Sequence, residues 1–151
     1  MAKKILDFDV DDHLDFDVIG IICAFKDYRL CFEINLLLDF KLKRVNDLEL
    51  TLEKKGSTGL FSFYQYISID NEQFFLITNK GNHTWFVPEQ KHIDYFMMIR
   101  NRASFTELHS LMKKLKSIPL INSVIIIDTA KLKSADHFLY IEEEKVSRKG
   151  I

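Results

Sequence analysis

The sequence predicts an α+β fold in which a mainly antiparallel, multi-stranded sheet carries two long helices on one face. Several segments are short and apolar, or alternate between apolar and polar residues, as strands do. Two other segments repeat apolar residues at the helical spacing. Short turn clusters separate the strand-like segments in the middle of the chain, which is typical of antiparallel neighbours.

Two strands are expected before the first helix. Leu6, Phe8 and Val10 alternate with aspartates, which predicts a strand with one buried face and one solvated face. Residues 18–24 instead form a continuous, β-branched apolar run, which predicts a strand buried on both faces.

The first helix is expected over residues 28–39, with Asp27 as its N-cap. Its apolar face comprises Leu30, Cys31, Ile34, Leu37 and Leu38. The second helix is expected to begin at a capping box formed by Ser104 and Glu107. Its apolar face comprises Phe105, Leu108, Leu111, Met112 and Leu115. The basic residues that complement its negative end are Lys113, Lys114 and Lys116.

The remaining strands are predicted from alternation and from turn residues. Leu48, Leu50 and Leu52 alternate with polar residues ahead of a turn rich in glycine and serine. Three aromatic-rich segments then fit an antiparallel meander: residues 60–69, 73–78 and 84–87. Pro88 cannot donate to a ladder and interrupts the pattern. After it we expect strands at 92–99 and 124–127, and a short edge strand at 138–141.

The length of 151 residues suits one domain. No linker or low-complexity stretch divides the sequence. We therefore expect one domain over residues 1–141 and a charged, flexible tail over residues 142–151.

Composition argues against several classes of protein. Hydrophobic residues make up 47% of the chain and charged residues 28%, which is a globular composition. Lysine and arginine total 21 against 22 acids, so no net field favours nucleic acid or anionic lipid. The longest apolar run, residues 18–25, is shorter than the ~20 residues that span a bilayer. Cys23 and Cys31 lie in apolar runs, which predicts free thiols in a reducing, cytoplasmic location.

The stretch from Val87 to Tyr95 reads VPEQKHIDY. It resembles the motif that names the IPExxxVDY family, with valine for the first isoleucine and isoleucine for the later valine. Residues 27–30 (DYRL) and 43–45 (KRV) are also similar to members of that family, so the resemblance spans most of the chain. It implies a bacterial cytoplasmic protein of the kind found in the Bacteroidota, encoded in some genomes near ribonuclease III and pyruvate kinase. The motif implies no established chemistry.

We interpret part of this motif as a structural tie. The residues of the tie are Pro88, Glu89, Asp94, Tyr95 and Arg29. We expect Pro88 to end a strand and Glu89 to bind main-chain donors or a nearby cation. Our hypothesis is that Arg29 holds Asp94 or Glu89 by a charge-assisted hydrogen bond, with Arg100 as the other candidate partner. Such a bond would join the first helix to the motif strand.

Other clusters fit structural roles better than catalytic ones. Glu89, His92 and Asp94 could transfer protons, but on a strand only His92 and Asp94 share a face. The acidic residues within 7–17 lack the glycine and terminal glutamate of an EF-hand loop. The aromatic residues of 60–87 could stack on bases, but no basic residues interleave with them as in single-strand binders. We therefore predict no metal site and no cofactor.

The sequence thus predicts a noncatalytic binding or protein-interaction module. It carries no nucleophile elbow, no phosphate-binding loop and no histidines at metal-ligand spacing. The partner would be another protein or a second copy of the chain, bound through an apolar sheet face or an edge strand. Two alternatives stay open: an RNA-associated accessory protein, and an enzyme with a site around Glu89, Asp94, Tyr95 and Arg29.

Overall fold

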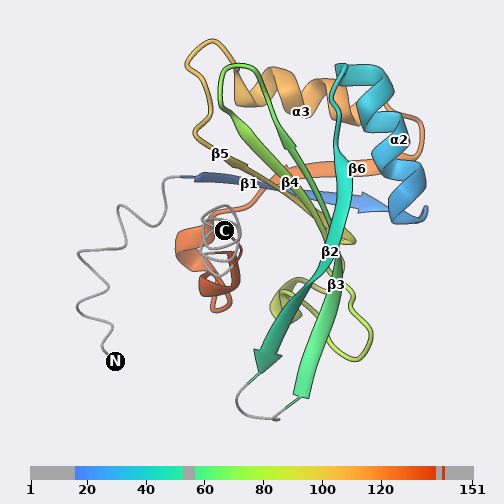
Figure 1. Cartoon of the computed structure of the whole chain (residues 1–151), viewed down its shortest axis with the longest axis vertical. Helices are drawn as coiled ribbons and strands as arrows, with labels where there is room; N and C mark the ends of the chain where they lie inside the picture. Colours follow the sequence, from blue (N-terminus) through green and yellow to red (C-terminus); the bar gives the residue numbers. More distant parts are fainter. Residues whose placement is uncertain (1–15, 53–56, 139–140, 142–151) are drawn as a thin grey trace.

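The computed structural model describes residues 16–52, 57–138 and 141. Their strands form one antiparallel sheet in the order β2-β3-β4-β5-β1-β6 (Figure 1). The strands are β1 (Phe16–Cys23), β2 (Lys43–Leu52), β3 (Ser57–Ile67), β4 (Gln73–Thr78), β5 (Tyr95–Arg100) and β6 (Ile121–Ile126). The helices are α2 (Asp27–Leu38) and α3 (Leu108–Lys116), with the short 3-10 helices η1 (Pro88–Gln90) and η2 (Thr129–Lys131). The predicted α+β class is confirmed.

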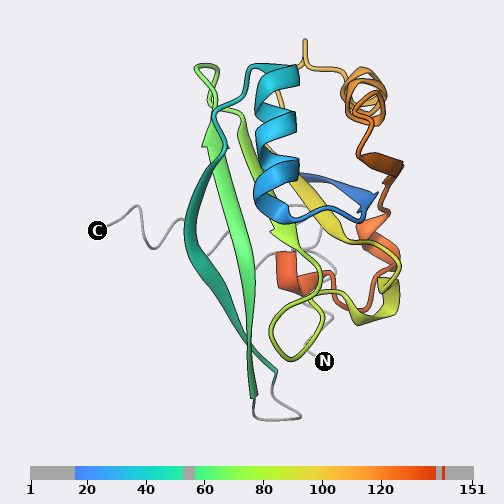
Figure 2. The same ribbon diagram turned by 90° about the vertical axis from the view of Figure 1, so that its right-hand side faces the viewer.

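One apolar cluster joins the sheet to the two long helices. Successive residues of a strand point to opposite faces, so Tyr95, Met97 and Ile99 of β5 share this cluster. We call it the helix-side cluster, because α2 and α3 both contribute buried side chains to it. Figure 2 shows the ribbon of α2 running beside the sheet. These helical residues are Leu30, Cys31, Ile34, Leu111 and Leu115.

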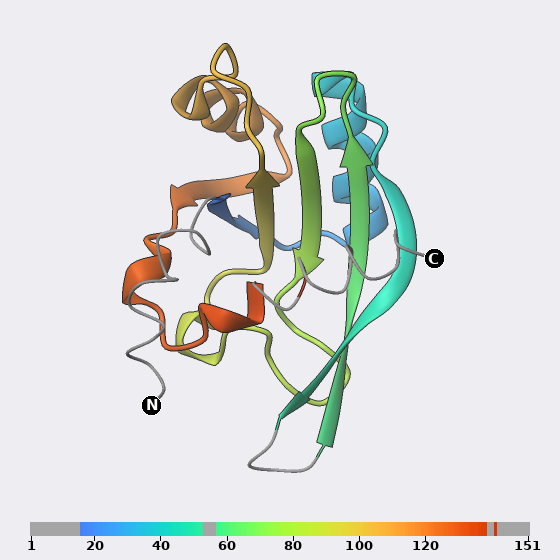
Figure 3. The same ribbon diagram turned by 60° about the vertical axis from the view of Figure 1, so that its left-hand side comes forward.

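The intervening strand residues belong to a second cluster, which connecting segments cover. We call it the loop-side cluster, and Phe96 and Met98 of β5 lie in it. Figure 3 shows residues 129–138, in red, in front of the sheet and α2 behind it. The side chains that these segments bury in the cluster are Phe86, Val87, Ile93, Phe138 and Ile141. Both faces of the sheet are therefore occupied by apolar side chains.

Several strands form where the sequence predicts them. β1 pairs with β5 on one side and with β6 on the other, which agrees with the buried strand expected at 18–24. On β2, Leu48 and Leu50 are buried while Glu49 and Thr51 are exposed, as the alternation predicts. β3 and β4 form the expected antiparallel pair around the turn at residues 68–72.

Three strand predictions are wrong in part or in full. Residues 84–87 form only an isolated bridge between Lys80 and Trp85, because they belong to a folded connection between β4 and β5. β5 begins at Tyr95 and not at residue 92, because η1 and a turn precede it. Residues 138–141 are not an edge strand: residues 136–138 and 141 are helical, and Phe138 and Ile141 are fully buried.

β6 also departs from its prediction. The sequence favours a buried strand at 124–127, whereas β6 starts earlier and forms an edge of the sheet. Ile126 there is 45% exposed. The apolar side chains of β6 contribute to both faces: Ile121 and Val124 pack in the helix-side cluster, and Ile125 packs against the loop-side cluster.

Both helices begin differently from the prediction. Lys26 is the N-cap of α2, and Asp27 is its first helical residue. No capping box forms at α3: the helix begins at Leu108, and Glu107 accepts a hydrogen bond from the Ser110 hydroxyl at 2.8 Å. Phe105 therefore precedes the helix and is 71% exposed. The predicted lysines do lie in the last turn of α3.

Two predictions fall on residues outside the described ranges. These are the strand containing Leu6, Phe8 and Val10, and the tail at 142–151. Across the described ranges, no helix is both long enough and apolar enough to cross a membrane.

Replacing Phe138 by alanine tests the packing of the loop-side cluster. The Phe138 ring is fully buried, with its centroid 5.1 Å from that of Phe86 and 5.4 Å from that of Phe96. We expect Phe138→Ala to lower the free energy of unfolding by about 3–5 kcal/mol in urea melts. The matched control Phe105→Ala should change it by less than about 0.5 kcal/mol. Equal effects of the two substitutions would contradict this packing.

Candidate functional site

The side chain of Asn79 organises the long connection between β4 and β5. It is fully buried, and its amide uses both donor hydrogens and its oxygen. Asn79 Nδ2 donates to the carbonyl oxygens of Gln90 and Ile93, each at 2.9 Å. Asn79 Oδ1 accepts from the main-chain N–H of Val87 at 2.7 Å. These bonds fold residues 79–94, which we call the motif loop, around one amide.

The main chain of Asn79 closes the same loop. Its N–H donates to the carbonyl oxygen of Asp94 at 2.9 Å, and its carbonyl accepts from the N–H of Phe86 at 2.7 Å. In the sequence, Asn79 opens a cluster of turn-forming residues, 79–82, between two strand-like segments. No local signal distinguishes a buried organising asparagine from an exposed turn asparagine, because its partners lie 7–15 residues further along the chain.

Glu89 binds a distant segment of the main chain. It follows Pro88 in η1, and its carboxylate accepts from the Ser134 N–H at 2.8 Å and from the Ser134 hydroxyl at 2.9 Å. The expectation that Glu89 binds main-chain donors is therefore confirmed. Burial alone would raise the pKa of Glu89, but these bonds and further main-chain N–H groups outweigh it and lower the pKa below its ordinary value.

Asp94 joins the start of β5 to the end of β1. Its carboxylate accepts from the N–H of Cys23 at 2.8 Å, and its own N–H donates to the carbonyl of Ile21 at 3.0 Å. Tyr95 makes a similar link one residue later, because its hydroxyl donates to the carbonyl of Phe25. Burial raises the pKa of the Tyr95 phenol, and the charge of Asp27 raises it further.

The proposed role of Arg29 is wrong. Its guanidinium lies 3.3 Å from the carboxylate of Glu33 on the same helix, and about half of its side chain is exposed. Within the described ranges, its ion pair is with Glu33 and not with Asp94 or Glu89. Arg100 lies six residues beyond Asp94, about 20 Å along a strand. The strand is tied to the region before α2, but main-chain donors and acceptors make the tie.

The motif residues therefore do not converge on one cavity. Glu89 binds Ser134, Asp94 binds Cys23, and Tyr95 binds the carbonyl of Phe25. An active site built from these groups with Arg29 would need them to face a common substrate.

A polar cleft does lie beside Tyr95, at the start of α2. Its volume is about 740 Å³, and Ser62, Lys80 and Asp47 are among the side chains that line it. Asp27 also lines it and accepts from the Tyr64 hydroxyl at 2.9 Å. Burial raises the pKa of Tyr64, and its hydrogen bond to Asp27 adds to the effect. The Tyr64 and Tyr95 phenols therefore stay protonated at neutral pH and donate to internal acceptors.

The buried thiols and the acidic residues do not form a reactive site. Burial raises the pKa of the Cys31 thiol to about 11 and also raises that of Cys23. Both remain thiols at neutral pH, whereas the thiolate is the nucleophile. Within residues 16–52, 57–138 and 141, no group of three or more His, Cys, Asp or Glu side chains is placed to hold a metal ion.

The aromatic-rich strands contribute mainly to the core. Phe61, Phe63, Phe74 and Phe75 are almost completely buried, and Tyr64 is 4% exposed. These rings are therefore not available as a stacking platform for bases, and the core interpretation is confirmed for them.

Exposed apolar side chains gather instead on α2. Tyr28, Phe32 and Leu36 are 65%, 59% and 70% exposed, and each is four residues from the next. Residues at this spacing lie along one line of a helix, so the three form a continuous strip, which we call the α2 stripe. The sequence analysis assigned the inward face of this helix and did not consider its outward face.

No family model matches the chain, and comparison with curated proteins and with solved structures gives no match.

Replacing Asn79 by alanine should destabilise the motif loop and the fold. The substitution leaves the Val87 N–H and the carbonyl groups of Gln90 and Ile93 without their hydrogen-bond partner. Each unpaired buried group lowers the free energy of unfolding by about 1 kcal/mol or more. We expect a loss of at least about 3 kcal/mol in the free energy of unfolding, together with faster hydrogen exchange at the Val87 amide. As a control, Asn82→Ala removes one exposed hydrogen bond to Leu60 and should cost less than about 1 kcal/mol. Unchanged exchange at Val87 would contradict the role of Asn79.

The Glu89 interaction should depend on pH. Because its folded-state pKa is lowered, the carboxylate stabilises the fold above its ordinary pKa of 4.5, and this contribution is lost as the pH falls through the folded value. Glu89→Gln should therefore cost about 0.5–1 kcal/mol at pH 7, a small effect because the side chain is exposed to screening solvent.

The difference between wild type and Glu89→Gln should shrink as urea melts are repeated toward pH 3. A double-mutant cycle with Ser134→Ala isolates the side-chain part of the interaction. A cost that stays constant between pH 7 and pH 3 would show that charge on Glu89 does not matter.

Proposed function

We propose that this protein is a noncatalytic protein-interaction module that binds a second copy of itself through the α2 stripe. The observation that carries the proposal is the exposure of three large apolar side chains along one line of a helix. Contiguous exposed apolar surface of this kind marks interaction sites, and exposed aromatic residues are enriched at interface centres.

The geometry of the α2 stripe supports self-association. Tyr28 and Leu36 lie at equal distances in sequence on either side of Phe32. If two α2 helices pack antiparallel about a two-fold axis at Phe32, Tyr28 of one copy lies against Leu36 of the other. The two Phe32 rings then meet at the axis. Such an interface is self-complementary without any further segment of the chain.

Charge also permits two copies to approach. The formal net charge is −1, so long-range repulsion between copies is small. Beside the stripe, Arg29 and Glu33 carry opposite charges and already pair on the same helix. No single-sign field therefore surrounds the apolar centre.

The interface would be small and the dimer concentration-dependent. α2 has 12 residues and is about 18 Å long. In a dimer, the three stripe residues of each copy would bury their exposed surface, which gives six side chains in total. Each burial stabilises the dimer by roughly 1 kcal/mol or more, whereas association itself costs about 4–15 kcal/mol. Phe25 and Leu37, 45% and 43% exposed, lie close enough in sequence to extend the contact.

A sheet face does not offer a comparable surface. Both faces carry buried clusters, and the exposed large apolar side chains of the described strands are Leu60 on β3 and Ile126 on β6, which are not neighbouring strands. We retain the cytoplasmic location and the likeness to the IPExxxVDY family as part of this proposal, supported by the motif and by two buried, free cysteines.

Substituting Phe32 tests the proposed dimer. Wild-type protein should pass from 17.8 kDa toward twice that mass over a concentration series in light scattering coupled to size exclusion. Phe32→Glu should remain monomeric, because it places two carboxylates at the axis. Phe105→Glu changes an equally exposed phenylalanine elsewhere and should leave dimerisation intact.

Cross-linking distinguishes a second copy from a different partner. Under mild oxidation, Phe32→Cys should form a covalent dimer across the axis, whereas Phe105→Cys should not. A strictly monomeric wild type at the highest soluble concentration, or dimers that survive Phe32→Glu, would overturn the proposal.

A further inference from the structure

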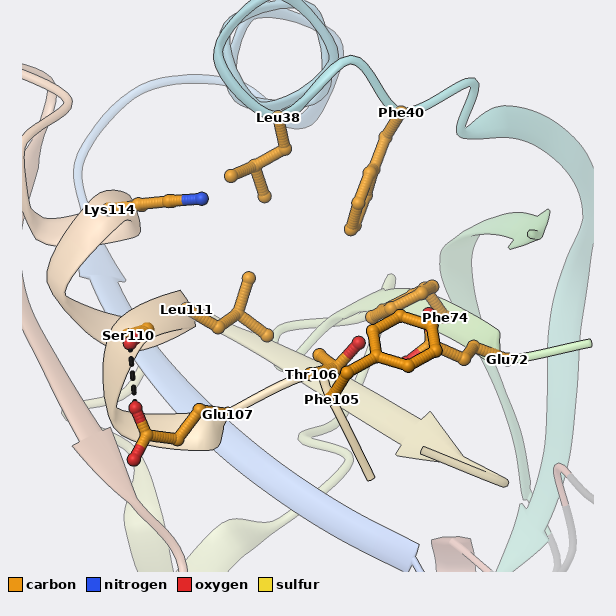
Figure 4. A pocket seen from close by; sticks show the side chains of 10 residues that line it. All are labelled: Leu38, Phe40, Glu72, Phe74, Phe105, Thr106, Glu107, Ser110, Leu111 and Lys114. Atoms are coloured by element: carbon orange, nitrogen blue, oxygen red, sulfur yellow. Dashed lines mark hydrogen bonds between the residues drawn. The ribbon is translucent and has the colours of Figure 1, made fainter. Parts of the chain in front are cut away.

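A cavity lies between the end of α2 and the start of α3 (Figure 4). Its volume is about 390 Å³, within the range of small-molecule sites. α2 ends at Leu38, where Asp39 adopts a left-handed conformation, and α3 starts only at Leu108. The gap left between the two helix ends reaches the sheet at Phe74.

Five of the ten residues that line the cavity are apolar. Leu38 and Phe40 are half-buried and pack against the helix-side cluster, and Phe74 and Leu111 are buried members of it. The Phe40 and Phe74 ring centroids lie 4.5 Å apart. Phe105 is 71% exposed and also lines the cavity. An apolar ligand would bury surface that the protein leaves uncovered.

The charged side chains around the cavity differ in whether they have hydrogen-bond or ion-pair partners. Glu107 accepts from the Ser110 hydroxyl, as the dashed line in Figure 4 shows, and Glu72 accepts from the N–H of Ala103 at 3.0 Å. The side-chain ammonium of Lys114 has no ion pair or hydrogen bond within the part of the chain that the structure describes. Its ammonium group points across the cavity toward Leu38 in Figure 4. Of the three charged side chains that line the cavity, only that of Lys114 lacks a partner among the described residues.

We propose that this cavity binds a small amphipathic organic anion. The apolar part of the ligand lies against Leu38, Phe40, Phe74 and Leu111, and its anionic group binds the Lys114 ammonium. Phe105 covers the mouth. This site does not depend on the α2 stripe, because none of its lining residues belongs to that stripe.

Three ligands that share a ten-carbon chain and differ in the charge of the head group test whether the cavity prefers an anion. Decanoate, decanol and decyltrimethylammonium are titrated separately into the full-length protein, and amide shifts are followed by NMR. Decanoate should give saturable shifts around Phe74 and Leu111, and should bind about fivefold more tightly than decanol or the cation. Absence of saturable shifts, equal or tighter binding of the cation, or shifts confined to the α2 stripe would overturn the proposal.

Neighbouring lysines of α3 provide matched variants. Lys113 and Lys114 are both exposed, but only Lys114 lines the cavity. Lys114→Glu should weaken decanoate binding about fivefold or more, and Lys113→Glu should change it less than about twofold. Both lysines lie in the last turn of α3, where glutamate interacts unfavourably with the helix dipole, so both variants should lose a similar, small amount of stability. Equal losses in the two variants would show a general effect of charge and would refute the Lys114 contact.

Discussion

The buried amide of Asn79 holds the connection between β4 and β5, and much of the loop-side cluster depends on that connection. Three side-chain and two main-chain hydrogen bonds of this residue fold the motif loop on itself. The folded loop places Phe86, Val87 and Ile93 in the cluster. A connection of this length would otherwise leave many polar main-chain groups without partners beside an apolar face. One asparagine therefore satisfies the loop and positions its apolar side chains.

From this loop, links run to three other parts of the chain. Glu89 binds Ser134, and His137 Nδ1 lies 2.6 Å from the carbonyl oxygen of Phe86, so residues 134–137 are held against the loop. Asp94 bonds to the end of β1. Tyr95 bonds to the turn that precedes α2. The stretch from Val87 to Tyr95 thus acts mainly through main-chain contacts, with the Ser134 hydroxyl as a side-chain partner of Glu89.

Because clusters cover both faces of the sheet, the surfaces available for binding lie on the helices. The α2 stripe is the outward face of a helix whose inward face is packed against the sheet. The cavity beside Lys114 lies between the end of α2 and the start of α3. Both features are consequences of short helices on a wide, twisted sheet, since short helices cover part of its surface and leave their own ends open.

The sequence by itself determined the fold class, the interior position of β1 and the β3–β4 pair, because periodicity along the chain reports which side chains are buried. It also determined the inward face of α2, except for Leu37, which is 43% exposed. It also indicated that Glu89 binds main-chain donors. Only the tertiary structure decided that Arg29 pairs with Glu33, that Asn79 organises the motif loop, and that Phe138 lies in the core. The last two outcomes depend on groups that are distant in sequence, such as Phe86 and Phe138, meeting in space. No local pattern encodes such a meeting, because the same residues satisfy turn, helix or strand preferences equally well until their partners are placed.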